Sequence, residues 1–317
     1  MGDKRVDTKK ISIIIPNYNG KVLLQKNLPS VISAAKSYDS KTEIIVVDDN
    51  SNDQSVFLIQ KTYPQILVYV NDKNYGFSTT CNRGVRMCSG DIVLLLNTDI
   101  SPEKNFINPL LKHFDDPNCF AVSCLDLSFE KNKEIERGRG IGKFARGFLI
   151  HQRGEINKTT TLWASGGSSA FDKKKWIELG GFDESFNPFY WEDIDLSYRA
   201  QKNGWMVWFE KESVVHHRHE EGVIRNQYSA ENIQEIAYKN QIIFMWKNIT
   251  DLSLQISHLF WLPYHLLKAF FNFDFSFIKA FVDALLCMVV IIRNRMRNQK
   301  SFVSDQEIVD KYKLEFK

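Results

Sequence analysis

The sequence predicts an α/β protein with a Rossmann-like, mostly parallel central sheet and a helical C-terminal extension. In its N-terminal third, short aliphatic runs alternate with segments of helical apolar periodicity. Strands are expected at residues 11–16, 43–47, 66–70 and 91–96, and helices at residues 22–37, 53–63 and 78–88. Strands that are apolar on both faces and alternate with helices indicate a parallel sheet that helices cover on both sides.

Composition narrows the class of protein. The chain has 317 residues, 44% hydrophobic and 25% charged, and its net charge of +3 is small against 41 basic and 38 acidic residues. That balance gives no argument for a nucleic-acid partner. The five cysteines are scattered and never spaced as C-x-x-C, which favours a reducing compartment. The polar N-terminal segment MGDKRVDTKK has no secretory pattern, so we expect a cytoplasmic protein.

Polar residues follow the first two predicted strands, at the sheet edge where α/β proteins bind ligands. Carboxylates at such an edge can accept hydrogen bonds from a base or a ribose hydroxyl. Turn formation by PNYNG, and capping of the next helix by Ser51 or Asp53, are the structural alternatives. The nucleotide-binding candidates here are Pro16, Asn17, Tyr18, Asn19, Asp48 and Asp49.

The third and fourth strands are followed by NYGFSTTCNRG and LLLNTD. A glycine before a helix lets backbone approach a ligand, and the helix N-terminus offers N–H groups to phosphate. Asp99 is placed to hold Mg²⁺ or Mn²⁺ through one carboxylate and substrate phosphates, although an ordinary turn would also end a strand at this point. These segments add the nucleotide-binding candidates Asn74, Gly76, Phe77, Asn82 and Asn97.

Three further motifs lie downstream. WASGGSSAF begins at residue 163, WEDID begins at residue 191 and places Glu192 and Asp193 at a helix start, and HHRH spans residues 216–219. A carboxylate such as Asp193 can act as a general base, whereas acidic residues at a helix start also interact favourably with the helix dipole. A zinc site is disfavoured because no cysteine accompanies the histidines, and Asp99 suits a hard, oxygen-preferring cation.

These motifs, in this order, resemble the inverting glycosyltransferases of family 2 with the GT-A fold, and most of all their rhamnosyltransferase-like members. The resemblance covers residues 10–245. It implies that Asp48 and Asp49 contact the nucleoside, and that Asn97-Thr98-Asp99 stands for the metal-binding D-x-D element and keeps only its last aspartate. It also implies that Gly166, Gly167 and Trp191 face the sugar and acceptor, that Asp193 is the general base beside Glu192, and that His216 lies near the metal, with His217 and His219 as alternatives.

The resemblance implies transfer of a sugar from a UDP- or dTDP-sugar to a hydroxyl of a lipid-linked or growing cell-surface saccharide. A nucleotidyltransferase is the alternative enzyme, but it would need a basic, glycine-rich phosphate loop after the first strand. A degenerate, membrane-bound scaffold protein is the non-enzymatic alternative, and retention of Asp99 and Asp193 argues against it.

Two regions are predicted on composition alone. Residues 130–142 are charged and glycine-rich, which indicates an exposed or mobile loop. We divide the chain into a catalytic domain at residues 1–245 and a helical segment at residues 246–317. Residues 252–271 and 273–292 are aromatic-rich and interrupted by charges, which favours helices lying on the inner face of the cell membrane over buried, dimer-forming or spanning helices.

Overall fold

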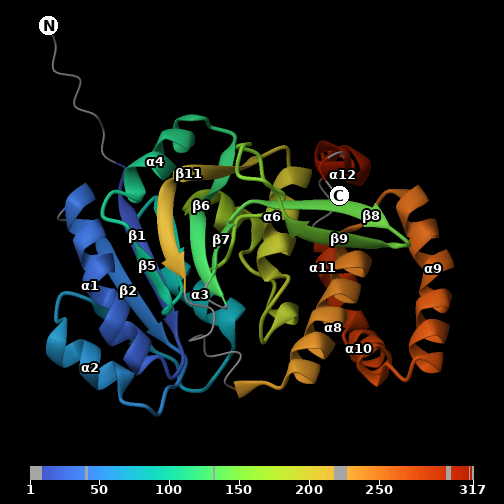
Figure 1. The fold of residues 1–317 in the computed structure, drawn as a ribbon, viewed down its shortest axis with the longest axis horizontal. Coiled ribbons are helices and arrows are strands. Elements are labelled where there is room, and N and C mark those ends of the chain that lie inside the picture. Colours follow the sequence, from blue (N-terminus) through green and yellow to red (C-terminus); the bar gives the residue numbers. More distant parts are fainter. Residues whose placement is uncertain are drawn as a thin grey trace, which may run out of the picture.

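The computed structural model describes residues 9–39, 42–130, 133–217, 227–297, 301–313 and 315. A large mixed sheet with helices on both faces forms one side of the molecule, and a group of helices lies beside it (Figure 1). The predicted α/β class and the helical C-terminal region are both confirmed.

The central sheet has nine strands in the order β3-β2-β1-β4-β10-β6-β11-β5, with β7 paired to β6. Strands β1 to β4 are parallel to one another, β10 is antiparallel to both neighbours, and β6 and β11 are parallel. The strands are β1 (Ile11–Asn17), β2 (Glu43–Asp48), β3 (Leu67–Val70), β4 (Ile92–Leu96), β5 (Ile100–Pro102), β6 (Cys119–Glu130), β7 (Lys133–Arg137), β10 (Ser168–Asp172) and β11 (Met206–His217).

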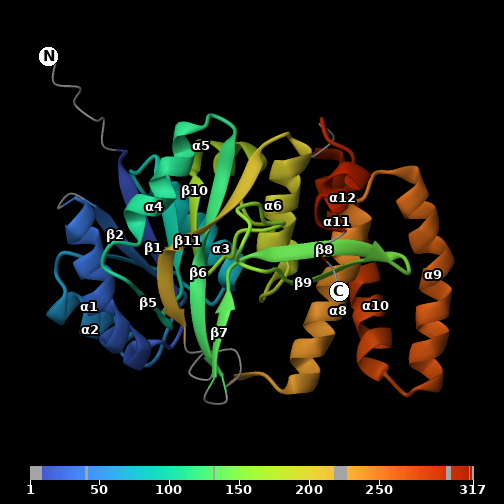
Figure 2. The same cartoon turned by 45° about the horizontal axis from the view of Figure 1, so that its top comes forward.

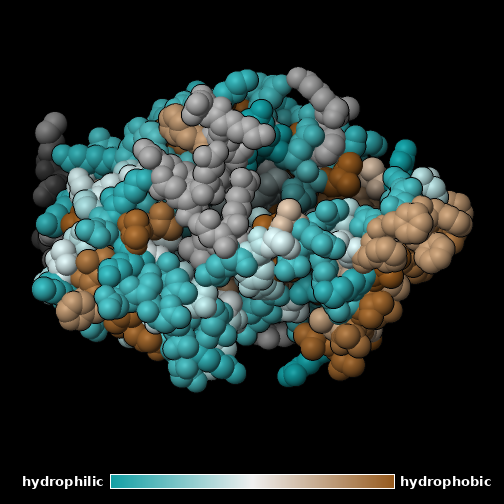
Figure 3. All heavy atoms as spheres, turned by 60° about the horizontal axis from the view of Figure 1, so that its bottom comes forward, coloured by the Kyte–Doolittle hydropathy of each residue, from teal (hydrophilic) through white to brown (hydrophobic). Residues whose placement is uncertain are grey.

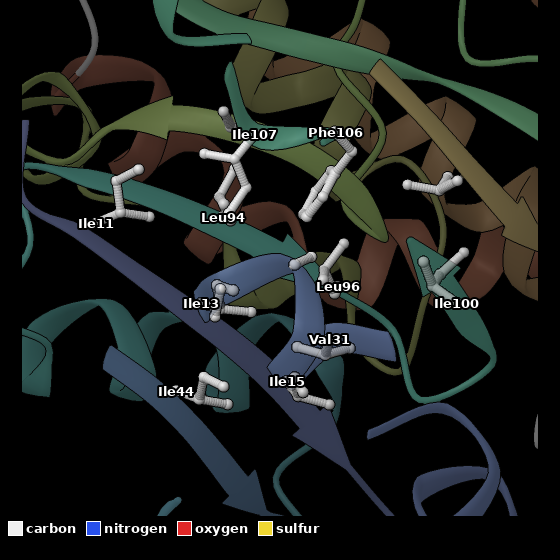
Figure 4. Packing of buried hydrophobic residues seen from close by; sticks show 14 of the residues in the cluster. Ile11, Ile13, Ile15, Val31, Ile44, Leu94, Leu96, Ile100, Phe106 and Ile107 are labelled. Carbon is white, nitrogen blue, oxygen red and sulfur yellow. The ribbon is translucent and has the colours of Figure 1, made fainter. Parts of the chain in front are cut away.

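Alternation along β1 and β4 sends apolar side chains to both faces of the sheet. Ile13 and Leu94 belong to a core on one face (Figure 4), whereas Ile14 and Leu95 belong to a core on the other. The first face is covered by α1 (Lys21–Tyr38), α2 (Ser55–Thr62), α4 (Ile107–Leu111) and the 3-10 turn Lys112–Asp115. The second is covered by α3 (Phe77–Met87), α5 (Lys173–Leu179) and α6 (Glu192–Lys202), with the 3-10 turn Glu184–Phe186 between the last two.

A β-hairpin lies beside the C-terminal helices (Figure 2), and a third hydrophobic cluster outside the sheet joins them. The hairpin strands are β8 (Gly140–Ala145) and β9 (Phe148–Arg153). The helices are α8 (Ala230–Asn248), α9 (Leu252–Phe271), α10 (Phe275–Leu286), α11 (Met288–Arg297) and α12 (Asp305–Lys313). The boundary that we predicted after residue 245 falls inside α8, and the cluster contains residues from both sides of it.

The prediction of an exposed loop at residues 130–142 is wrong for the described part of that segment. Lys133–Arg137 forms the edge strand β7 against β6, and Gly140 begins the hairpin. Between them Arg139 is buried, and its guanidinium pairs with Glu315 at 2.8 and 3.0 Å and donates to the Thr160 carbonyl. The partner that allows this arginine to be buried lies far along the chain, so local composition could not indicate it.

Two buried ionic networks join α6 to the C-terminal helices. Lys247 of α8 places Nζ 2.7 Å from Asp195 of α6 and 2.5 Å from Asp183. Lys202 of α6 places Nζ 2.8 Å from Asp305, whose carboxylate also accepts the backbone N–H groups of Thr250 and Asp251. The C-terminal helices are therefore attached to α6 at two points, through Lys247 of α8 and through Asp305 of α12.

The two apolar stretches form three helices. The helical conformation is interrupted between Leu286 and Met288, so the second stretch is divided into α10 and α11. Within the described ranges, no single helix combines the length and apolar character needed to cross a membrane; α10 and α11 together do so by length and composition, but they are bent by 58°.

Candidate active site

A cavity of about 460 Å³ opens at the carboxyl ends of β1 and β4. Most of the residues predicted from the motifs line it, although they come from segments far apart in the sequence. They are Pro16, Asn17, Tyr18, Asp49, Asn74, Gly76, Phe77, Asn97, Asp99, Gly166, Gly167, Glu192 and Asp193. The sheet therefore brings the upstream and downstream motifs together at one site.

Asp48 and Asp49 have different surroundings. Asp48 is fully buried and does not line the cavity; it accepts from the Asn17 amide at 2.6 Å and from the Ser51 N–H at 2.9 Å. Asp49 lines the cavity and accepts from the backbone N–H groups of Tyr75 and Gly76 and from the Asn71 amide. In this structure both aspartates hold loops of the site in place.

The N–H groups at the start of α3 have partners within the protein. The N–H of Phe77 donates to the Pro188 carbonyl at 3.4 Å, and that of Ser78 donates to the Asn187 side chain at 3.2 Å. Gly76 has a φ of +86°, and a Cβ there would lie 2.9 Å from Asn187. In this structure these N–H groups hold the segment before Glu192, and phosphate binding at this helix start stays a prediction.

Four other predicted residues lie outside the cavity lining. Asn82 is buried and bonds through its amide to the Phe182 backbone, and the Asn19 side chain accepts from the Asn52 N–H. Trp191 is buried between the rings of His151 and Phe244. His216 is partly exposed, with Nε2 3.6 Å from Glu103.

His217, the other described histidine of the motif, faces Asp99. Its Nε2 lies 3.1 Å from Asp99 Oδ2, and its Nδ1 lies 2.9 Å from Asp126 Oδ2. Successive side chains on a strand point to opposite faces, so only one of the pair at residues 216 and 217 can reach Asp99. Burial alone would lower the pKa of His217, but hydrogen bonds and charge from Asp126 and Asp99 raise it to about 9. His219 lies outside the described residues.

Asp99 suits a hard divalent cation. Its Oδ1 is buried and has no hydrogen-bond partner among the described residues, and the side chain lines the cavity. In the described part of the chain, no three His, Cys, Asp or Glu side chains are grouped to hold a metal by themselves. A cation here would therefore complete its coordination with oxygens of a bound phosphate.

Glu192, which is buried, and Asp193, which is half-buried, form a pair of neighbouring carboxyl groups. Asp193 Oδ2 accepts the Gly166 N–H at 3.1 Å, and Oδ1 accepts the Ile194 N–H at 2.8 Å. Glu192 Oε2 is buried and has no partner among the described residues. Burial, reinforced by the charge of Asp193, raises the pKa of Glu192 well above its usual range, and burial also raises the pKa of Asp193. Asp193 accepts two backbone N–H groups, whereas Glu192 Oε2 accepts none among the described residues, so Asp193 is the better placed of the two to carry the negative charge.

A strained turn presents this pair. Tyr190 and Trp191 have φ values of 72° and 75°, a region that non-glycine residues rarely adopt. The side chain of Asn240 in α8 donates to the carbonyl groups of Phe186, Phe189 and Tyr190 at 2.7–2.9 Å. This turn directs Trp191 into the core and leaves Tyr190 in the cavity wall.

Sequence reasoning missed several residues of the cavity wall. Arg137 of β7, Ser165 and Tyr228 line it with His217 and Tyr190. Arg137 lies in the segment predicted to be a loop, so its place in the sheet could not be assigned. The alternation of β11 is the signal that could have separated His217 from His216.

The architecture is the GT-A nucleotide-diphospho-sugar transferase fold. The structure matches a crystal structure of GalNAc-T7 with UDP, GalNAc and Mn²⁺ at a TM-score of 0.62 and 19% identity, over 78% of this chain and 49% of the other. It also matches a mannosyltransferase from Pyrobaculum calidifontis in complex with GDP-Man and Mn²⁺ at a TM-score of 0.55 and 17% identity, over 90% of this chain and 76% of the other. The chain belongs to glycosyl transferase family 2, whose model matches residues 12–178.

Curated relatives agree with this membership. A chondroitin synthase of Pasteurella multocida is 26% identical over 224 residues, which is 61% of this chain and 23% of the relative. An undecaprenyl-phosphate 4-deoxy-4-formamido-L-arabinose transferase of Pseudomonas syringae is 33% identical over 109 residues, which is 33% of this chain and 32% of the relative. The chain thus spans about a quarter to a third of the length of these relatives.

Proposed function

We propose that the protein is an inverting glycosyltransferase that moves a sugar from a nucleotide-diphosphate sugar to a hydroxyl acceptor. The observation that carries this proposal is the presence of Asp99 and Asp193 in the wall of one cavity of a family 2 chain. One carboxylate suits the diphosphate end of a donor, and the other suits an acceptor hydroxyl. UDP- and dTDP-sugars are the donors that we favour, and the rhamnosyltransferase-like branch remains a prediction.

The proposed reaction is a single displacement. The acceptor oxygen forms a bond to the anomeric carbon while the bond from that carbon to the diphosphate oxygen breaks. Asp193 takes the hydroxyl proton, because two backbone N–H groups stabilise its carboxylate and that of Gly166 fixes its orientation. Asp99 would hold a divalent cation, which His217 could join only after losing its proton, and the bound cation would neutralise the leaving diphosphate as a Lewis acid. Arg137 adds a guanidinium to the same wall.

We propose a lipid-linked or growing cell-surface saccharide as the acceptor. Support comes from the names of the relatives, which include an undecaprenyl-phosphate transferase and a chondroitin synthase. We also propose that α9–α11 contact the inner face of the cell membrane. These helices expose many large apolar side chains (Figure 3), among them Leu252, Ile256, Leu259, Phe260, Leu267, Phe270, Phe271, Leu286 and Val289.

A panel of UDP-, dTDP- and GDP-sugars with Mn²⁺ tests the proposed activity. We expect one nucleotide class to raise the melting temperature and to release its nucleoside diphosphate when an acceptor is added. A panel in which no nucleotide sugar binds would refute the proposal.

We expect Asp99→Ala to weaken Mn²⁺-dependent donor binding by more than about tenfold, because loss of even an outer partner of a metal ligand typically costs about 10–100-fold in metal affinity. Calorimetry with and without Mn²⁺ measures the effect. Full activity of the unmodified protein after thorough treatment with EDTA would exclude the metal role for the whole site.

The two adjacent histidines give a matched pair of variants. His217→Ala should weaken Mn²⁺-dependent donor binding, because His217 Nε2 lies 3.1 Å from Asp99. His216→Ala should leave it unchanged, because that side chain faces Glu103. Equal losses in both variants, measured by the same calorimetry, would contradict the assignment of His217.

A further inference from the structure

A second cavity of about 600 Å³ lies among the β8–β9 hairpin, α8, α9 and α10. It shares no lining residue with the cavity that contains Asp99 and Asp193. His265 of α9 bonds to the Arg146 carbonyl at 2.9 Å and so ties the tip of the hairpin to the helix (Figure 1). The proposed reaction uses none of these residues.

The lining of this cavity combines cationic and apolar side chains. Lys143, Arg146 and Lys268 line it, whereas Asp274 is the one carboxylate among its lining residues. Asp274 is already used as the cap of α10, where Oδ1 accepts the Phe277 N–H. Within the described ranges, neither Arg146 nor Lys268 forms an ion pair. The apolar part of the lining comes from Ala145, Phe148, Ile150, Ala269 and Phe277. This combination suits an anionic group attached to an apolar chain.

The turn between α9 and α10 forms the rim of the cavity. The end of α9 and this turn contribute the lining residues Ala269, Asn272 and Asp274, and four exposed phenylalanines lie between or directly after them in the sequence. Phe270, Phe271, Phe273 and Phe275 have exposed fractions of 61, 72, 76 and 60%. Exposure of such an apolar cluster to water costs free energy, and it marks a surface that contacts a membrane or another protein.

We propose that this cavity binds the phosphate headgroup of an anionic lipid while the phenylalanine rim enters the bilayer. The inference rests on the membrane contact proposed above and specifies its chemistry. Apolar side chains that enter the interface and cations that meet the lipid phosphates stabilise membrane binding together. The cavity gives the three cations one common target, which scattered surface lysines would not have.

The second cavity lies near the segment that precedes Glu192. Phe148 and Ile150 of β9 line the cavity, and His151 of the same strand packs against Trp191, the residue before Glu192. Successive side chains of a strand point to opposite faces, so the cavity and Trp191 lie on opposite faces of β9, and a bound headgroup would be one strand away from the segment that precedes Glu192.

Flotation with vesicles tests the proposal in the full chain without any sugar substrate, so its outcome is independent of the proposed activity. A truncation at Leu252 would be a poor test, because it removes Asp305 and Tyr312, which are buried against the rest of the fold. The test variant is Lys143→Gln/Arg146→Gln/Lys268→Gln. The control variant Lys61→Gln/Arg86→Gln/Lys174→Gln removes the same charge from exposed positions on α2, α3 and α5.

We expect the unmodified protein to bind phosphatidylcholine vesicles more tightly when they contain phosphatidylglycerol. Each cavity cation should contribute about fivefold near an anionic surface, so the test variant should lose at least tenfold in affinity for these vesicles. The control variant should lose much less. Phe270→Ser/Phe271→Ser/Phe273→Ser should reduce binding to both kinds of vesicle.

Equal binding by the test and control variants would overturn the proposal, as would equal binding of the unmodified protein to neutral and anionic vesicles. Binding of inorganic phosphate that depends on the cavity cations, without binding to vesicles, would assign the site to a free anion and would also overturn it. Should the triple variant fold poorly by circular dichroism, Arg146→Gln/Lys268→Gln removes only the two most exposed cations and decides the question.

Discussion

Asp193→Asn should lower the turnover number by about 10²–10⁴-fold, which is the usual contribution of a general base. The amide keeps the shape of the carboxylate and an acceptor for the Gly166 N–H, so the site should remain assembled. Donor binding, measured by calorimetry, should therefore stay close to that of the unmodified protein. Transfer at a normal rate by the variant would remove Asp193 from the role of base.

Glu192→Gln is the matched control, because an amide resembles a protonated carboxyl group. Burial and the charge of Asp193 raise the pKa of Glu192, so we expect the neutral form to prevail there and its replacement to change turnover only a few-fold. A loss as large as that of Asp193→Asn would show that the two roles are reversed.

The pH profile supplies a second measurement of the same assignment. A base must be ionised, so kcat/KM should fall as the pH falls through the pKa of Asp193. Because burial raises that pKa, the acidic limb should lie at higher pH than an exposed aspartate would give. An acidic limb at the pH expected for an exposed aspartate would contradict a raised pKa for Asp193.

Lys247→Met should lower the free energy of unfolding by about 3–5 kcal/mol, as expected when one partner of a buried ionic network is removed. Lys247 is 3% exposed and contacts both Asp183 and Asp195. In the variant, Asp195 keeps its ion pair with Arg199, so Asp183 is the carboxylate left without its cationic partner. Urea unfolding measures the change. Lys279→Met is the control, since its pair with Glu235 lies on an exposed side chain and should matter little.

At acid pH, the difference in unfolding free energy between the unmodified protein and Lys247→Met should become smaller. Burial alone would raise the pKa of Asp183, but the charge and hydrogen bond of Lys247 hold it well below its usual range. The ionised carboxylate therefore stabilises the fold above the pKa of an unfolded aspartate, and this contribution is lost as the pH falls. Without Lys247, burial should raise the pKa of Asp183. Protonation of Asp183 at acid pH would then remove the unpaired buried charge that destabilises the variant. A difference that stays constant from neutral to acid pH would contradict this account.

The N-terminal half of the fold was predictable because its signals are local. Strands β1 to β4 are apolar on both faces, and the polar residues that follow them reach one edge of the sheet through parallel topology alone. The C-terminal half depends on distant contacts. The burial of Arg139 requires Glu315, and the packing of the β8–β9 hairpin requires α8 and α9, so neither could be seen in a local window.

Predictions about single residues in the site failed where neighbours in sequence point in different directions. His216 and His217 differ by one position on a strand, and that step decides which of them meets Asp99. Trp191 was expected in the cavity, but the left-handed backbone at Tyr190 and Trp191 places Tyr190 there instead. A motif gives the position of a side chain along the chain, whereas its direction depends on backbone angles that the motif does not specify.

The ionic attachment of α6 to α8 and α12 limits how this protein can be recombined. A hybrid joined at residue 245 would receive α6 from one parent and the partners of Lys202 and Asp195 from the other. The buried charges of Lys202 and Asp195 would then need matching charges in the incoming segment. Exchange of acceptor-side segments between such proteins should succeed only when the lysine and aspartate positions of both networks travel together.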